Sequence, residues 1–372
     1  MAMLAYLLAL VGMAATGFAL YFGGIGILID HPDLSALVWE WTPVSQGDLA
    51  YWGAAGWMGF GMNGAETALA SLLFLTALAP ITVSVFLAML TFWRRFSAFA
   101  GVVMATWTAL MLAPLVGNWT QGGGWLMHLG ESLGAGNGFL DEAGASFFLL
   151  PTGMALAMLF LPKRTSSEKS EDHGGWGAIL VLVGGIGWVV ASPLHLWLEI
   201  SPAQAVLNAL LSAAAGGFIG LVYSWFVWRE PSAIWGGRGV TAGFVASLAG
   251  ISWMHSLQAM LVGAVATWIC ILSFYFIHDR WGRDDDGLFS AFGLPALWGI
   301  LAVGLFAPAP GQTRAQFIGA LVVFFMGFLA AVLFQIGIAF FSLIRRERPQ
   351  QAGQAPPSSP ALQDDFGGGD GE

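Results

Sequence analysis

The sequence predicts an all-α polytopic membrane protein. Charged residues make up 9% of the 372 residues, and the mean hydropathy is +0.73. Long apolar runs alternate with short polar connections, and many of the 18 Trp lie near the ends of these runs. Such a composition is typical of an integral membrane protein with aromatic belts at the two interfaces.

Ten apolar runs are predicted to be spanning helices. A span needs about 20 residues, since the hydrocarbon core is ~30 Å thick and a helix rises ~1.5 Å per residue. The connection at 30–63 is acidic and rich in Trp and Gly, and its apolar pieces are too interrupted to span. The runs lie at residues 2–29, 66–92, 96–117, 143–161, 176–198, 203–228, 239–256, 258–278, 288–306 and 315–344.

Basic residues predict the orientation. They occur in alternate connections, at 94–95, 163–164, 229 and 238, 280 and 283, and 345–346, and the other connections hold only Arg314. By the positive-inside rule, these connections and both termini are expected on the cytoplasmic side of the cell membrane. We expect a transmembrane channel domain at 1–348 and a disordered tail at 349–372, which is rich in Pro, Gln, Ser, Gly and Asp.

The composition argues against several other functions. Cys270 is the only cysteine, which excludes an intrachain disulfide and a multi-thiolate metal site. The six His show no metal-ligand spacing, so we expect no cofactor. The net charge of −9 does not suggest nucleic-acid binding, and no catalytic set of a soluble type is present. We expect no enzyme, and we read the N-terminus as a retained helix without a signal-peptide pattern.

Two segments share one design, which suggests an internal repeat. The first is a glycine-rich loop that ends at Asp141 and leads into an uncharged run closed by Lys163 and Arg164. The second begins at Asp284 and leads into the run at 288–307. In transporters, repeated segments often surround a central pathway. Small and hydroxyl residues in both runs favour close helix contact or a pore wall over lipid.

Several motifs, in this order and spacing, resemble the ammonium transporter/Rhesus-glycoprotein family. They are Arg-Phe-Ser-Ala at 95–98, Gly-Gly-Gly-Trp-Leu at 122–126, Asp-x-Ala-Gly at 141–144, Gly-x-Phe-Ser at 287–290 and Trp-Gly-x-Leu-Ala-Val-Gly-Leu-Phe at 298–306. The resemblance covers about 66–306. It implies a homotrimer with one pore per subunit, built from two inverted five-helix repeats. The run at 2–29 resembles the second of the family's eleven helices, so we expect the first to be missing.

The departures from the family bear on function. The two pore histidines of the family fall on Leu149 and Phe292. The stacked phenylalanines of its outer gate fall on Leu78 and Ala191, and Phe74 lies close by on the same run. The recruiting Trp falls on Gln121, and Trp119 lies two residues earlier. The vestibule Ser falls roughly on His195, whereas Asp141 is kept.

Each candidate also has a structural interpretation. Asp141 either caps a helix that begins at Glu142 or recruits a cation. His195 either lines the pore or bonds its own helix. Leu149, Phe292, Leu78 and Phe74 would otherwise be core or lipid-facing residues. The polar candidates for the pore wall are Ser146, Thr152 and Ser290, whose hydroxyls can also bond their own backbone.

His255 is expected at an interface, and His128 and Glu131 in solvent. We therefore expect a hydrophobic channel that passes a small neutral molecule. Ammonia is favoured by the resemblance, and carbon dioxide is possible. The alternative is a non-conducting or weakly conducting sensor or binding protein that resembles ammonium transporters and signals to an unknown cytoplasmic regulator.

Overall fold

The structure is a computed structural model that describes residues 1–22, 38–41, 50–53, 67–159, 174–192, 201–281, 287–307 and 309–346. The chain divides into two compact units, Met1–Val332 and Leu333–Glu372. The expectations for Lys163, Arg164, His195, Asp284 and the tail lie outside the described residues. In the second unit, the described residues belong to the helix that ends at Arg346.

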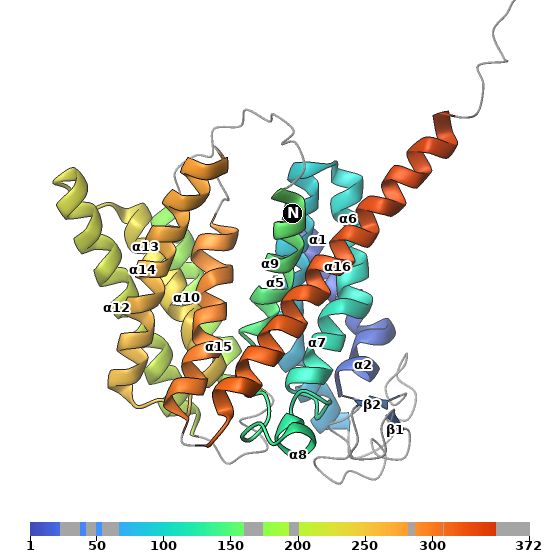
Figure 1. The fold of residues 1–372 in the computed structure, drawn as a ribbon, viewed down its shortest axis with the longest axis horizontal. Coiled ribbons are helices and arrows are strands. Elements are labelled where there is room, and N and C mark those ends of the chain that lie inside the picture. Colours follow the sequence, from blue (N-terminus) through green and yellow to red (C-terminus); the bar gives the residue numbers. More distant parts are fainter. Residues whose placement is uncertain are drawn as a thin grey trace, which may run out of the picture. The chain divides into compact units, whose positions relative to one another are not determined.

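The described residues are almost entirely helical, which confirms the predicted fold class (Figure 1). Three turns of π-helix interrupt or begin helices, at Met13–Gly17, Thr108–Leu112 and Leu288–Gly293. The helices of the first half are α1 (Ala2–Gly12), α2 (Phe18–Phe22), α5 (Thr67–Arg95), α6 (Ala98–Trp107), α7 (Ala113–Thr120), α8 (Leu129–Leu133) and α9 (Ser146–Leu159). Those of the second half are α10 (Gly174–Val190), α12 (Pro202–Trp228), α13 (Ala233–Ser247), α14 (Ser256–Trp281), α15 (Leu294–Phe306) and α16 (Gln312–Arg346).

Seven of the described helices are long and apolar enough to cross a membrane. Two shorter apolar helices, Ser146–Leu159 and Gly177–Val190, lie in runs that were expected to span. The expected number of ten spans therefore remains a prediction. The seven are Ala2–Phe22, Leu72–Arg95, Ala98–Thr120, Pro202–Trp228, Ser256–Ile277, Leu288–Phe306 and Gln312–Phe340.

Part of the acidic connection forms strands that the sequence analysis did not predict. β1 (Val38–Trp41) pairs antiparallel with β2 (Ala50–Gly53), with Trp39 opposite Trp52. Tyr, Trp and Val favour strands, and the alternation of these residues over so few positions is too short to reveal a hairpin.

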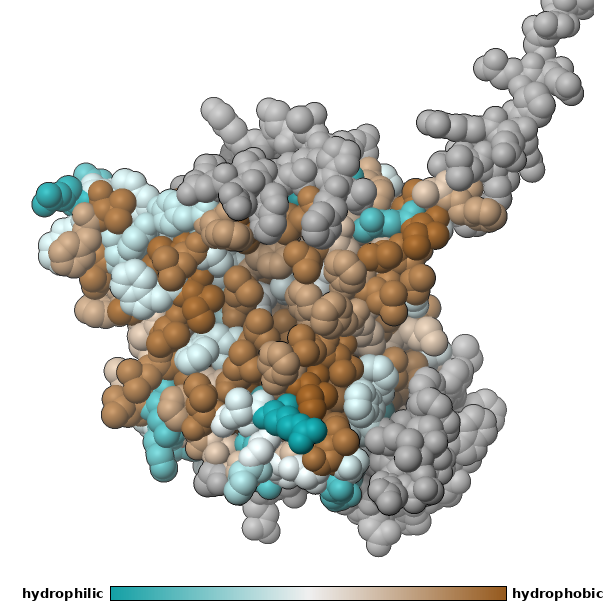
Figure 2. All heavy atoms as spheres, in the orientation of Figure 1, coloured by the Kyte–Doolittle hydropathy of each residue, from teal (hydrophilic) through white to brown (hydrophobic). Residues whose placement is uncertain are grey.

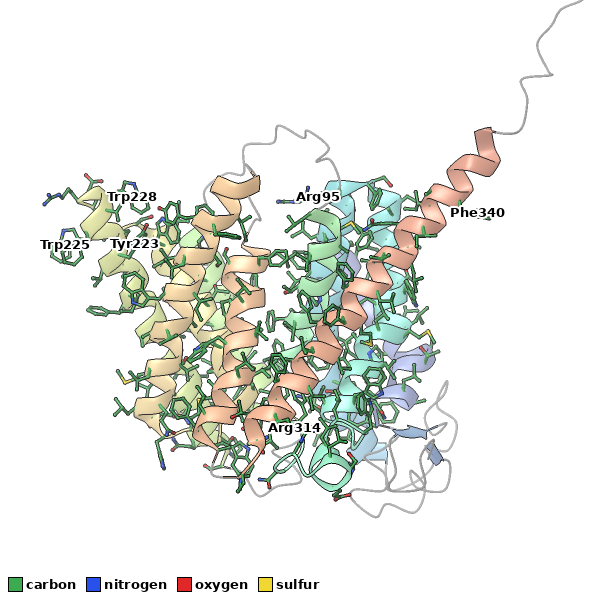
Figure 3. The ribbon with its side chains drawn as sticks, viewed as in Figure 1. Arg95, Tyr223, Trp225, Trp228, Arg314 and Phe340 are labelled. Carbon is green, nitrogen blue, oxygen red and sulfur yellow. The ribbon has the colours of Figure 1, made fainter. Side chains whose placement is uncertain are left out.

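The charged ends of the helices agree with a transmembrane orientation. Figure 3 shows Arg95, at the end of α5, and Arg314, near the start of α16, at opposite ends of the helices. Figure 2 shows an apolar surface over the helices between them, as expected for a surface that faces lipid. Exposed aliphatic and aromatic side chains on the described helices include Leu180, Leu272 and Phe325.

The two segments predicted to be repeats begin in the same way. Gly144 precedes α9 with φ of +84°, and Gly287 precedes the turn at Leu288–Gly293 with φ of +80°. A left-handed backbone strongly favours glycine, so these positions reverse the chain before each helix. The two segments pack closely at Gly293 and Thr152. A Cβ added to Gly293 would lie only 2.3 Å from Cγ2 of Thr152, so this position has no room for a side chain.

Candidate functional site

Asp141 caps α9, although the helix begins later than expected. Its Oδ1 accepts the N–H of Ala145 at 2.7 Å and its Oδ2 accepts the N–H of Ser146 at 2.9 Å. The first helical residue is Ser146, so the expected start at Glu142 is wrong by four residues. The cause is the left-handed Gly144, which cannot belong to a right-handed helix. Burial raises the pKa of the Asp141 carboxyl, and the hydrogen bonds from Ser146 and Ala145 oppose that rise.

Gln121 organises the loop in front of this cap. Its Nε2 donates to the carbonyl oxygens of Asp141 at 2.9 Å and Glu142 at 3.2 Å, and its Oε1 accepts the hydroxyl of Tyr21. The side chain is 1% exposed. Gln121 is therefore a buried structural residue. Trp119, two residues earlier, packs its ring edge-on against the ring of Trp125, with the ring centroids 5.9 Å apart.

Glu142 links the two halves of the first unit, which the sequence analysis did not anticipate. Its amide donates to the carbonyl of Ala249 at 2.9 Å, and its Oε2 accepts the N–H of Ser252 at 2.7 Å. Its carbonyl accepts the hydroxyl of Ser192, next to Ala191, at 2.6 Å. Burial raises the pKa of Glu142 to about 7. An acidic residue just before an apolar run is the only sequence signal of this link.

Aromatic rings meet at Phe292, one of the two positions that the resemblance assigns to the pore histidines. The rings of Phe148 and Phe292 stack at 5.6 Å, and those of Phe148 and Trp188 stack at 5.5 Å. These three side chains, from α9, the turn before α15, and α10, are called the ring stack below. Their spacing is within the range of favourable aromatic pairs. Leu149, at the other histidine position, is 1% exposed.

A cavity of about 620 Å³ adjoins the ring stack. One face of α5, including Leu78, and one face of α10 form most of its wall, and all three rings of the stack contribute. Leu149, Phe74 and Ala191 are not among the lining residues, and Phe74 stacks on Phe18 at 6.3 Å. The structure thus brings Leu78 and Phe292 to one cavity.

The hydroxyl candidates do not line this cavity. Thr152 donates to the carbonyl of Phe148 at 2.7 Å, and Ser146 lies 3.5 Å from the Thr120 hydroxyl. Both side chains and that of Ser290 are at most 1% exposed. In the loop between α7 and α9, His128 lies 3.4 Å from Glu131, whose side chain is 84% exposed, whereas that of His128 is 26% exposed and so less solvated than expected. No group of three potential metal ligands occurs among the described residues.

A model of the Ammonium Transporter Family matches residues 1–354. The chain belongs to this family. It is 28% identical over 220 residues to an ammonium transporter of Bacillus subtilis, a match that covers 57% of this chain and 52% of the relative. It is 28% identical over 241 residues to the ammonium transporter Amt1 of Archaeoglobus fulgidus, covering 62% and 57%. The chain thus spans about half the length of the relatives it matches.

Solved structures share the fold. A structure named Sensor Amt Protein matches with a TM-score of 0.69 and 18% identity, over 93% of this chain and 84% of that one. Candida albicans Mep2 matches with a TM-score of 0.63 and 19% identity, over 92% and 84%. Nitrosomonas europaea Rh50 matches with a TM-score of 0.53 and 19% identity, over 72% and 71%. Membership of a transporter family confirms the prediction that the chain is not an enzyme.

Proposed function

We propose that this member of the ammonium transporter family passes a small neutral molecule through an apolar pathway. The observation that carries the proposal is the chemistry at the two positions assigned to the pore histidines. Leu149 and Phe292 have no donor, acceptor or titratable group. Phe292 belongs instead to the ring stack.

An ammonium ion needs what these side chains lack. To cross a dry pathway it must lose its water or its proton, and an unpartnered buried charge costs several kcal/mol or more. Paired imidazoles would offer hydrogen bonds and a route for the proton. A neutral molecule requires neither, because its transfer to an apolar cavity strands no charge. The names of the relatives favour ammonia. Carbon dioxide is also small and uncharged, so it too could enter an apolar cavity without leaving a buried charge.

Flux measurements test this proposal. Purified protein in liposomes should admit ammonia, carbon dioxide or both faster than protein-free liposomes of the same lipid, measured by stopped-flow mixing with an enclosed pH indicator. Enclosed carbonic anhydrase makes carbon dioxide uptake visible to the same indicator. Equal rates with and without protein, for both gases, would contradict conduction.

A sensor is the second candidate. The ring stack occupies the place of one pore histidine, and the fold resembles that of a protein named as a sensor. A sensor would bind ammonium without flux and would change its affinity for a cytoplasmic protein. A pull-down from cell extract with and without ammonium, run beside the flux assay, separates the two functions. Ammonium-dependent capture together with no flux would favour the sensor.

Assembly and orientation are proposed from the family resemblance and the charge pattern. We expect a homotrimer in the cell membrane, and native mass spectrometry in detergent should show it, whereas a stable monomer or dimer would count against it. Single cysteines at Ser166 and Gly123, in a Cys270→Ser background, should be labelled from opposite sides of the membrane. Labelling from one side would overturn the orientation.

A further inference from the structure

The cavity beside the ring stack is long and lies along the membrane-spanning part of the chain. Its lining on α5 extends from Leu75 to Leu90. These residues are fifteen positions apart, which is about 22 Å along a helix at ~1.5 Å per residue. A hydrocarbon core is ~30 Å thick, so the cavity extends over much of its depth. The outer-loop residues Trp119, Gln121 and Asp141 are not part of the lining.

The cavity is open at its side, between α5 and α10. Leu75 on α5 is 64% exposed and Leu180 on α10 is 72% exposed, and both line the cavity. Deeper lining residues are buried: Phe148 is 3% exposed and Phe244 is 1% exposed. The lining therefore runs from the surface of the helices inward to the ring stack.

The lining is suited to a neutral molecule. None of the described residues that form it is charged. The hydroxyl of Thr82 donates to the carbonyl of Leu78 at 2.7 Å, so it is already engaged. An ion in this cavity would lose its hydration and gain no charged partner among the described lining residues, which is unfavourable. An apolar or weakly polar molecule would lose little.

We infer that the solute reaches the ring stack sideways from the bilayer, through an opening that runs along the facing sides of α5 and α10. Leu75 and Leu180 both lie on apolar helices, so the medium outside the opening is hydrocarbon. The substrate class is then a small uncharged molecule that partitions into lipid, such as a dissolved gas or the free-base form of a weak base. This inference rests on the proposed function, because it supplies the route for the neutral solute.

The route can be located without measuring transport. In a Cys270→Ser background, a nitroxide label at Ala79 or Val181 reports from the cavity lining. Labels at Leu272, which is 67% exposed on α14, and at Glu131, in the outer loop, serve as references for lipid and for water. Electron paramagnetic resonance in liposomes then measures relaxation by oxygen, which dissolves in lipid, and by a water-soluble nickel chelate.

The cavity labels should behave like Leu272, with strong relaxation by oxygen and weak relaxation by the nickel chelate. Strong relaxation by the nickel chelate, as at Glu131, would mean that the cavity opens to water. Weak relaxation by both agents would mean that a protein segment or a second copy covers the opening. Either result would overturn the inference.

A matched pair of variants tests whether the opening carries the flux. Gly184 lines the cavity and Gly177 lies on the same helix outside it, and an added Cβ meets nothing within 4 Å at either. Gly184→Trp should reduce neutral flux by roughly fivefold or more, because an indole would obstruct the opening, and Gly177→Trp should change it less than about twofold. Flux that Gly184→Trp leaves unchanged would overturn the lateral route. If the labels are accessible from lipid but the protein passes no gas, the lateral opening would be supported and the proposed function contradicted.

Discussion

The rings of Phe148 and Phe292 lie 5° from parallel, with their centroids 5.6 Å apart. One residue comes from α9 and the other from the turn before α15, so this contact joins the two repeated segments. The family resemblance assigns Phe292 to a histidine position. The other histidine position is Leu149, the residue after Phe148. An apolar contact therefore lies at and next to the two positions where imidazoles would have joined the same segments.

Phe292→Ala should widen the pathway and destabilise the protein. Loss of a packed phenylalanine costs about 3–5 kcal/mol in a core, and Phe292 is only half-buried, so we expect the lower end of that range. Neutral flux per folded protein should rise because the ring stack loses a member. Stopped-flow uptake and thermal unfolding measure the two effects. Phe317→Ala, at a 53% exposed position, is the control and should change neither.

Asp141 variants decide between a helix cap and a cation-recruiting charge. Asp141→Ala should lower thermal stability by roughly 1–2 kcal/mol through loss of the cap, and Asp141→Asn, which keeps one acceptor oxygen, should lower it less. If the charge only stabilises α9, flux per folded Asp141→Asn protein should stay within about twofold of the wild type. A much larger loss of flux with intact stability would assign the charge to recruitment.

Glu142 should make the protein more stable in mild acid. Its pKa in the folded protein is about 7, compared with an ordinary value of 4.5, so folding favours the protonated form. The contribution of Glu142 to stability is then fully present below pH 4.5 and is lost as the pH rises to about 7. The loss is up to ~3 kcal/mol. Glu142→Gln should remove this dependence between pH 5 and 8. Thermal unfolding across that range is the measurement, and parallel curves for the two proteins would contradict the prediction.

Gly153 should tolerate no side chain. A Cβ there would lie 2.0 Å from the carbonyl oxygen of Phe324, so α9 and the part of α16 before Val332 touch through backbone. Gly153→Ala should destabilise the protein by roughly 1–3 kcal/mol. Gly177→Ala, where space is open, should be neutral or stabilising by up to ~1 kcal/mol. Equal melting temperatures for the two variants would refute this close contact.

The sequence predicted the helical fold well, because apolar runs such as 203–228 reflect the thickness of a bilayer directly. A helix cap was one of the two interpretations of Asp141 that the sequence offered, and its carboxylate accepts two N–H groups at the start of α9. The sequence did not predict that Gly144 delays the helix start, since glycine conformation depends on how α9 meets Gln121. Nor did it predict the ring stack or the Glu142 link, because both join residues distant in the chain, and such contacts leave no local pattern. The bond from the Thr152 hydroxyl to the carbonyl of Phe148 is one of the two alternatives that the sequence left open, because an i−4 contact is local.

The central claim is that this chain keeps the family scaffold and moves no charge. Electrophysiology on solid-supported membranes, with the same proteoliposomes used for stopped-flow uptake, tests it most directly. We predict no ammonium-evoked current above that of protein-free liposomes, together with protein-dependent flux of a neutral gas. A robust ammonium-evoked current that survives His195→Ala would show that the argument from Leu149 and Phe292 is wrong.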